Sequence, residues 1–110
     1  AVIQAAQRQG FRFHVGIGRS HDSFYTDREE EIDAYWSRRG VLGADMETAA
    51  LFVAGGLRGV KTASILNTVV ESSGILEDGI NQYVDGDSLT KQGEENEIRT
   101  ALEAIVKMNQ

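Results

Sequence analysis

The chain has 110 residues, of which 41% are hydrophobic and 25% are charged, and its formal net charge is −6. That length is enough for one domain with a buried core. The acidic balance argues against binding to nucleic acid or to an anionic membrane, and no apolar run is long enough to cross a bilayer. The sequence has no cysteine, which removes disulfide and thiolate chemistry and fits a cytoplasmic protein.

The first part of the sequence predicts a helix followed by a strand. Residues 1–9 place alanines on one side of a helix, and Gly10 suits its left-handed end. Residues 11–17 alternate apolar and polar side chains before becoming apolar, which predicts a strand that contains His14 and ends at Gly18. We expect His14 to be a strand or core residue rather than a ligand.

The acidic segment that follows predicts a helix beginning after Asp27. Asp27 and Glu30 have the spacing of a capping box, and Gly40 is expected to stop the helix. One apolar stripe interrupts the acidic side chains and comprises Ile32, Tyr35 and Trp36.

A short strand and an apolar helix come next. Residues 41–42 are the predicted strand, and the helix over 46–54 is weakened or ended by Gly55 and Gly56. Small residues around this junction permit close backbone approach.

The last part of the sequence predicts a strand, a loop and a helix. Residues 60–70 are rich in β-branched side chains, which predicts a central strand buried on both faces. Residues 71–87 predict a long loop with a helical turn near 80–84. The final helix over 94–108 carries an apolar face of Ile98, Ala101, Leu102, Ile105 and Val106. Helices and strands therefore alternate, which indicates an α/β fold with helices covering a largely parallel sheet.

Two carboxylates, Asp45 and Glu47, lie where the strand over 41–42 gives way to the next helix. In an open α/β sheet the carboxyl end of a strand is where ligands usually bind. Either acid could instead favour the helix dipole, worth about 0.3–1 kcal/mol, or lie in solvent. Glu47 could also accept hydrogen bonds from a pair of sugar hydroxyls. Taken alone, the residues leave these alternatives open.

The polar loop over 19–26 carries two adjacent aromatic residues. Phe24 could offer a ring on which a planar heterocycle stacks, whereas Tyr25 is expected to pack beneath the loop. His21 is expected to be exposed in this loop. His14 and His21 cannot supply a multi-histidine metal site, and no phosphate-binding glycine loop, nucleophile elbow or zinc motif is present.

Three short motifs occur in order along the chain: His14-Val15-Gly16, Ser20-x-Asp22-x-Phe24-Tyr25-Thr26 and Gly43-x-Asp45-Met46-Glu47-x-Ala49-Ala50. Together they resemble the carboxyl-terminal half of the nucleoside phosphorylase family, which includes uridine phosphorylases and hexameric bacterial purine nucleoside phosphorylases. The likeness runs over about residues 14–70, and the family has Glu-Met-Glu where this chain has Asp45-Met46-Glu47. It implies part of a three-layer α/β/α fold with a central mixed sheet. Residues 1–110 are then the carboxyl-terminal portion of a single domain whose phosphate-binding half lies outside them.

The resemblance assigns roles to individual residues. Glu47 matches the carboxylate that holds the ribose hydroxyls and is the expected catalytic residue. Met46 matches the residue that packs against the sugar, and Phe24 matches the aromatic that stacks on the base. Asp45 matches an acid near the substrate pocket. The implied reaction is reversible phosphorolysis of a nucleoside to free base and ribose 1-phosphate, with inorganic phosphate as co-substrate and no cofactor. No metal-ligating residues are expected in this chain, and the sequence does not fix whether the reaction requires a metal.

The resemblance does not fix the base. Purine phosphorylases carry an aspartate after the strand over 60–70 and uridine phosphorylases an arginine nearby, but positions 69 and 70 here are valines. Uracil leaves as a delocalised anion and needs no carboxylic acid donor, so we prefer uridine. Weaker candidates for contacts to the base are Arg28, Asn67 and Gln82. The alternatives are a purine nucleoside phosphorylase, a nucleosidase that uses water, and a non-catalytic nucleoside-binding domain.

The resemblance further implies a homo-oligomer built from dimer units, with a hexamer as one alternative. In the family, glycine and arginine residues of the amino-terminal half hold phosphate, and this acidic chain offers little beyond Arg19. We therefore expect residues 1–110 alone to lack phosphorolytic activity. Neither nucleic acid nor a membrane is an expected partner.

Overall fold

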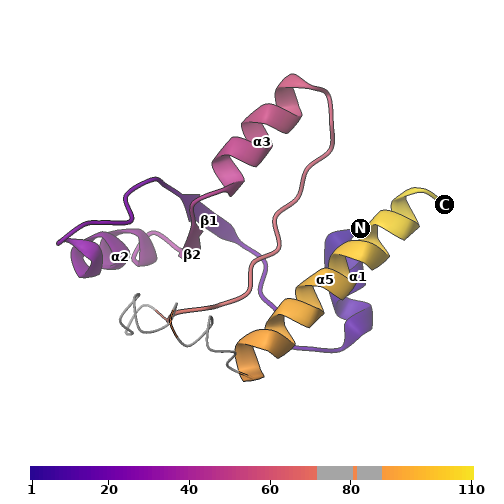
Figure 1. Cartoon of the computed structure of the whole chain (residues 1–110), viewed down its shortest axis with the longest axis horizontal. Helices are drawn as coiled ribbons and strands as arrows, with labels where there is room; N and C mark the ends of the chain where they lie inside the picture. The colour runs from indigo at the N-terminus through magenta and orange to yellow at the C-terminus, as the bar shows by residue number, and fades with distance from the viewer. Residues whose placement is uncertain (72–80, 82–87) are drawn as a thin grey trace. The chain divides into compact units, whose positions relative to one another are not determined.

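The computed structural model describes residues 1–71, 81 and 88–110. Helices and strands alternate along most of the chain (Figure 1), and the labelled elements are α1 (Val2–Gln9), β1 (Ile17–Ser20), α2 (Glu29–Ser37), β2 (Val41–Asp45), α3 (Thr48–Leu57) and α5 (Ser88–Met108). This order of helices and strands confirms the α/β class. None of the described helices has the length and apolar character that crossing a membrane requires.

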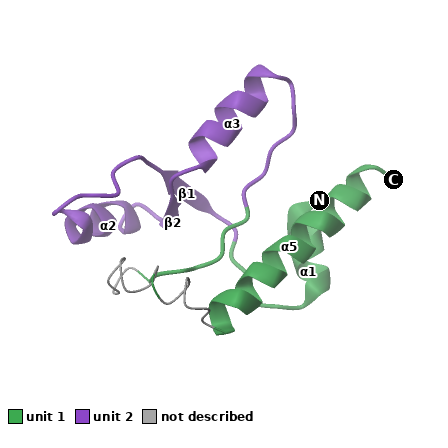
Figure 2. Ribbon diagram, in the orientation of Figure 1, with its two compact units in different colours: residues 1–14, 65–110 green, residues 15–64 purple. Residues whose placement is uncertain are grey.

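The chain divides into two compact units (Figure 2). The strand unit is residues 15–64, and the helical unit is residues 1–14 together with 65–110. In the strand unit, β1 and β2 form a parallel two-stranded sheet with α2 in the connection between them. Parallel strands need such a crossover, and their carboxyl ends meet at one edge of the sheet. Here that edge is formed by the pair Ser20 and Asp45.

The helical unit is built on the packing of α1 against α5. Its buried side chains are small and come from both helices: Ala5, Ala6, Thr100 and Ala104. Small side chains let the two helices approach closely. At the rim of this contact, the Glu103 carboxylate accepts hydrogen bonds from Arg8 and Gln9.

The strand predicted over residues 11–17 is wrong in its position. β1 begins at Ile17, contains Gly18 and ends at Ser20, so His14 lies outside the strand and is exposed. The pairing register explains the shift, because β2 pairs with residues 17–20. β2 itself is longer than predicted and runs from Val41 through Asp45.

The central strand predicted over residues 60–70 is also wrong, since the structure describes no strand in this segment. Its β-branched residues favour a pleated, half-buried surface, but a strand also needs a neighbour for its backbone hydrogen bonds. The sheet of the described residues contains β1 and β2 and gives this segment no such neighbour.

The predicted helix end agrees with the structure at α1 but not at α2 and α3. α1 ends at Gln9 and is followed by Gly10, whose φ of 77° confirms the left-handed position. α2 begins at Glu29 without a side-chain capping bond, so the predicted capping box is wrong. The hydroxyl of Thr26 instead accepts a hydrogen bond of 3.2 Å from the N–H of Arg28. α3 continues through both glycines to Leu57 instead of ending at them.

The last helix is longer than predicted, because α5 starts at Ser88 instead of residue 94. Its predicted apolar face is not its buried face: Thr100 and Ala104 are buried, while Leu102 and Ile105 are more than half exposed. The loop predicted over residues 71–87 and its helical turn fall almost entirely outside the described residues.

Candidate functional site

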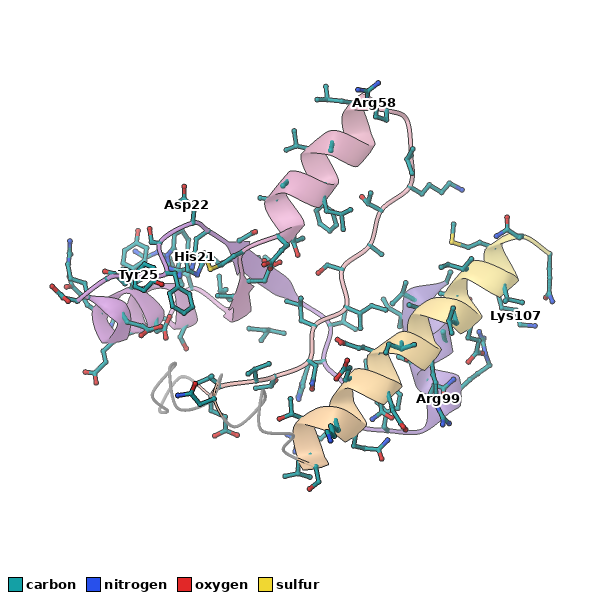
Figure 3. All side chains as sticks on the ribbon, in the orientation of Figure 1. His21, Asp22, Tyr25, Arg58, Arg99 and Lys107 are labelled. Atoms are coloured by element: carbon teal, nitrogen blue, oxygen red, sulfur yellow. The ribbon has the colours of Figure 1, made fainter. Side chains whose placement is uncertain are left out.

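The carboxyl ends of β1 and β2 bring two predicted motifs to the same edge of the sheet. Beyond the strand pair Ser20 and Asp45, the N–H of His21 donates a hydrogen bond of 3.0 Å to the carbonyl of Asp45. The loop that contains Phe24 and the segment through Met46 and Glu47 that leads into α3 therefore leave this edge together. Figure 3 labels His21 and Asp22 on the loop that follows β1.

Asp45 caps the start of α3. Its Oδ2 atom accepts hydrogen bonds from the N–H of Glu47 at 3.3 Å and the N–H of Thr48 at 2.7 Å, and also from the hydroxyl of Thr48. The next amide, that of Ala49, donates to Ser20 Oγ at 3.0 Å. The first amides of a helix have no intrahelical acceptor, and here side chains at the sheet edge supply one for each of these residues.

The same contacts keep Asp45 ionised. Partial burial alone raises the pKa of Asp45, but hydrogen bonds from the hydroxyl and N–H of Thr48, from Ser20 and from the N–H of Glu47 outweigh it. The pKa of Asp45 therefore lies below its ordinary value. A carboxylate is an acceptor only, which matches the donors that surround it. Its predicted contact with substrate stays a prediction, while its capping role is observed.

Glu47 presents its carboxylate at the surface of this edge. The residue is exposed, and its Oε2 atom accepts a hydrogen bond of 3.1 Å from the N–H of Met46. Within the described part of the chain, its Oε1 atom has no hydrogen-bond partner. Met46 beside it is 40% exposed. The pair thus combines an accessible acceptor with an accessible apolar surface, which suits the face and hydroxyls of a sugar.

The two aromatic residues of the loop contact each other. The rings of Phe24 and Tyr25 meet edge to face with centroids 5.0 Å apart. Tyr25, labelled in Figure 3, is 96% exposed, so the expectation that it packs beneath the loop is wrong. Phe24 is 37% exposed and keeps part of its ring available to a planar ligand. His21 is half-buried, and its Nδ1 atom accepts a hydrogen bond of 3.1 Å from the N–H of Ser23.

The weaker candidates are not gathered at this edge by any contact of the described residues. Arg28 precedes α2, and its guanidinium donates two hydrogen bonds, of 3.0 and 2.9 Å, to the Glu31 carboxylate. Asn67 belongs to the helical unit, where its amide donates to the carbonyl of Thr90 at 2.8 Å. Gln82 lies outside the described residues. Contacts of these three residues with a base stay predictions.

Sequence reasoning did not single out Thr48 and Ser64, whose hydroxyl oxygens lie 2.9 Å apart. Thr48 could have been found from its distance in sequence to Asp45, because a capping side chain accepts a hydrogen bond from the amide of a residue shortly after it in the chain. Ser20 was part of a motif without an assigned role. No local pattern marks Ser64, since its position depends on how the chain returns after α3.

Met46 and Glu47 are both exposed at this edge. Two hollows on the described residues are lined by residues 26–31 and by residues of α2 and its flanks, and neither of these two is lined by Asp45, Met46 or Glu47. No group of three or more His, Cys, Asp and Glu side chains in the described part of the chain is placed to hold a metal ion.

Two purine nucleoside phosphorylases are similar in sequence to part of this chain. The chain is 42% identical over 52 residues to the DeoD-type purine nucleoside phosphorylase of Roseobacter denitrificans, covering 47% of this chain and 22% of that protein. It is 42% identical over 64 residues to the DeoD-type enzyme of Clostridium novyi, covering 58% of this chain and 27% of that protein.

A third relative is similar along almost the whole chain. The uridine phosphorylase of Salmonella typhimurium is 25% identical over 122 aligned positions, which cover 98% of this chain and 45% of that protein. The chain thus spans less than half the length of each of these relatives. No solved structure matched it. The family model described as the phosphorylase superfamily matches residues 1–106, so the chain belongs to the phosphorylase superfamily.

Proposed function

We propose that this chain forms the sugar- and base-binding part of a nucleoside phosphorylase, with uridine as the preferred substrate. The observation that carries the proposal is the placement of Glu47. Its carboxylate is exposed, has one oxygen without a partner in the described residues, and follows the capped carboxyl edge of a parallel sheet. Membership of the phosphorylase superfamily supplies the reaction class.

In this proposal Glu47 holds the ribose hydroxyls through the reaction. Cleavage of a glycosidic bond passes through an oxocarbenium-like sugar, and hydrogen bonds to the 2-hydroxyl strengthen in that transition state. A fixed carboxylate also orients the sugar for attack by phosphate. Met46 supplies apolar contact beside the carboxylate, and Phe24 offers a partly exposed ring for the base.

We further propose that polypeptide outside residues 1–110 binds the phosphate. A helix start can bind an anion through its free amides. At α3, however, the amides of Glu47, Thr48 and Ala49 already donate to Asp45 and Ser20. The net charge of −6 is a further obstacle to anion binding. Purified residues 1–110 are therefore expected to show no phosphorolysis of uridine, and robust turnover by them alone would overturn this part of the proposal.

The test substitutes Glu47 in the complete enzyme. Glu47→Gln and Glu47→Ala are expected to lower kcat/KM for uridine phosphorolysis by about 100-fold, since loss of substrate positioning has effects of this size. Glu30→Gln, which also changes an exposed carboxylate but lies on α2, is the matched control and is expected to keep full activity. Full activity of Glu47→Ala contradicts the proposal.

Purine nucleosides are the second candidate substrates. They are favoured by the 42% identity to the two DeoD-type purine nucleoside phosphorylases, whereas the uridine phosphorylase matches more of this chain. Assays with uridine and inosine as substrates compare the two directly. Repeating each assay without phosphate separates phosphorolysis from hydrolysis, because a nucleosidase releases base without phosphate.

A further inference from the structure

We propose that Thr48 is a positioning residue for Glu47, acting through a chain of hydrogen bonds from Ser64 to Thr48 to Asp45. The inference rests on the proposed role of Glu47 as the ribose-holding carboxylate. It adds to that role a side chain that acts on Glu47 through Asp45. The hydroxyl of Thr48 lies between two partners, with Asp45 Oδ2 on one side and Ser64 Oγ on the other.

The direction of these bonds follows from the number of available protons. Asp45 is an ionised carboxylate and can only accept, so the single proton of the Thr48 hydroxyl points to it. The 2.9 Å contact between Thr48 Oγ1 and Ser64 Oγ then needs its proton from Ser64. The hydroxyls thus form a one-way chain that ends on the Asp45 carboxylate.

This chain connects three separate backbone segments. Asp45 is the last residue of β2, Thr48 is the first residue of α3, and Ser64 lies in the segment after that helix. Glu47 stands between the first two, and its own N–H donates to the same Asp45 oxygen at 3.3 Å. Because the backbone on both sides of Glu47 is held by one carboxylate, the location of the Glu47 side chain depends on where that carboxylate lies.

The Thr48 hydroxyl can be removed without removing the cap. The amides of Glu47 and Thr48 continue to donate to Asp45 when Thr48 is replaced by valine, which has a similar shape. The substitution deletes only the link to Ser64 and the hydroxyl donor to Asp45. Its effect therefore reports on positioning more than on the presence of α3.

The experiment compares Thr48→Val with Thr48→Ser in the complete enzyme. Thr48→Val is expected to lower kcat for nucleoside phosphorolysis about ten-fold or more, with KM for phosphate unchanged, because a small misplacement of a positioned group is costly. Thr48→Ser restores the hydroxyl and is expected to recover most of the activity. Thr62→Val, in the same unit but outside this hydrogen-bond chain, is the matched control and is expected to behave as wild type.

A second measurement separates this inference from the proposed function. Amide chemical shifts of Glu47 are expected to move in Thr48→Val and to return in Thr48→Ser, whether or not the protein cleaves nucleosides. If the wild type cleaves no nucleoside, the proposed function fails. The amide chemical shifts of Glu47 then test the positioning inference alone, and shifts that do not move overturn that inference. Wild-type activity in Thr48→Val also overturns the inference and leaves the role of Glu47 intact. If Thr48→Val does not fold, Ser64→Ala breaks the same chain and is expected to give a weaker loss of the same kind.

Discussion

Asp27 and Asp45 each precede a helix in the sequence, but only Asp45 makes the capping hydrogen bonds. Neither N-cap residue, Arg28 of α2 or Glu47 of α3, makes a side-chain capping bond, but Asp45 accepts hydrogen bonds from the amides of Glu47 and Thr48. The difference comes from the backbone before the helix. Asp45 ends a paired strand that holds it in place, while Asp27 lies in a loop where the Thr26 hydroxyl bonds the Arg28 amide instead.

This contrast predicts different costs for the same substitution. Asp45→Ala is expected to lower the free energy of unfolding by about 0.5–2 kcal/mol, the range observed for lost helix caps. Asp27→Ala is expected to change it by less than about 0.5 kcal/mol, as for other surface positions. Denaturant unfolding followed by circular dichroism measures both, and equal costs at the two positions would contradict the capping role of Asp45.

The contribution of Asp45 also has a defined pH dependence. Because the pKa of Asp45 in the folded protein lies below its ordinary value of 3.8, its stabilising effect is fully present above that value. It is lost as the pH falls through the lower pKa of the folded state. The stability difference between wild type and Asp45→Ala should therefore shrink in this acid range and stay constant near neutral pH.

Among the elements, α3 contains two adjacent glycines in different surroundings. A Cβ atom at Gly55 would lie under 3.0 Å from the side chain of Thr62, whereas a Cβ atom at Gly56 has no neighbour within 4 Å. Thr62 is β-branched and has little rotamer freedom to move away. Gly55 therefore permits close approach of the returning chain.

Alanine substitution of the two glycines should have opposite effects. Gly56→Ala is expected to stabilise the protein by about 0.5–1 kcal/mol, because alanine has the better helix propensity. Gly55→Ala gains the same propensity but forces Thr62 to shift, at a cost of about 1–3 kcal/mol typical of overpacking. Thermal or denaturant unfolding of the two variants provides the comparison. Stabilisation by both would show that Thr62 yields freely.

Features that depend on neighbouring residues in sequence were predictable, and features that depend on distant partners were not. The end of α1 at Gly10 and the passage from β2 into α3 at Asp45 follow from local chemistry. The strand expected over residues 60–70 requires a paired neighbour, which no local pattern supplies. In the same way, the acceptors for the first amides of α3 could not all be identified without the position of β1. Ser20 of β1 is one of these acceptors, together with Asp45.

At the scale of the whole molecule, much of the apolar surface is exposed. α3 is apolar along most of its length and has no buried residue, with Val53 63% and Leu57 82% exposed. The apolar face predicted for α5 is exposed as well, including Ile105 at 57%. A helix that is apolar on all sides is normally buried in a larger core. The chain spans less than half the length of the uridine phosphorylase that it matches.

This exposure predicts that residues 1–110 associate in solution. Large exposed apolar surfaces mark interaction sites or lead to aggregation. We expect sedimentation velocity at micromolar concentration to show species larger than a monomer, and 8-anilinonaphthalene-1-sulfonate fluorescence to rise on mixing. Val53→Lys with Leu57→Lys should reduce both signals while changing unfolding free energy by less than about 0.5 kcal/mol per site, since both side chains are exposed.

The control for association is Lys61→Gln, which changes an exposed charge near the same helix and should leave the sedimentation profile unaltered. A strictly monomeric wild type that binds no dye would contradict the expectation.

The size distribution also bears on the proposed homo-oligomer. A closed assembly sediments as one defined species, because closed symmetry fixes the number of copies, whereas unspecific burial of apolar faces gives a broad distribution that grows with concentration. Loss of a single defined species in the double lysine variant would locate the contact on α3.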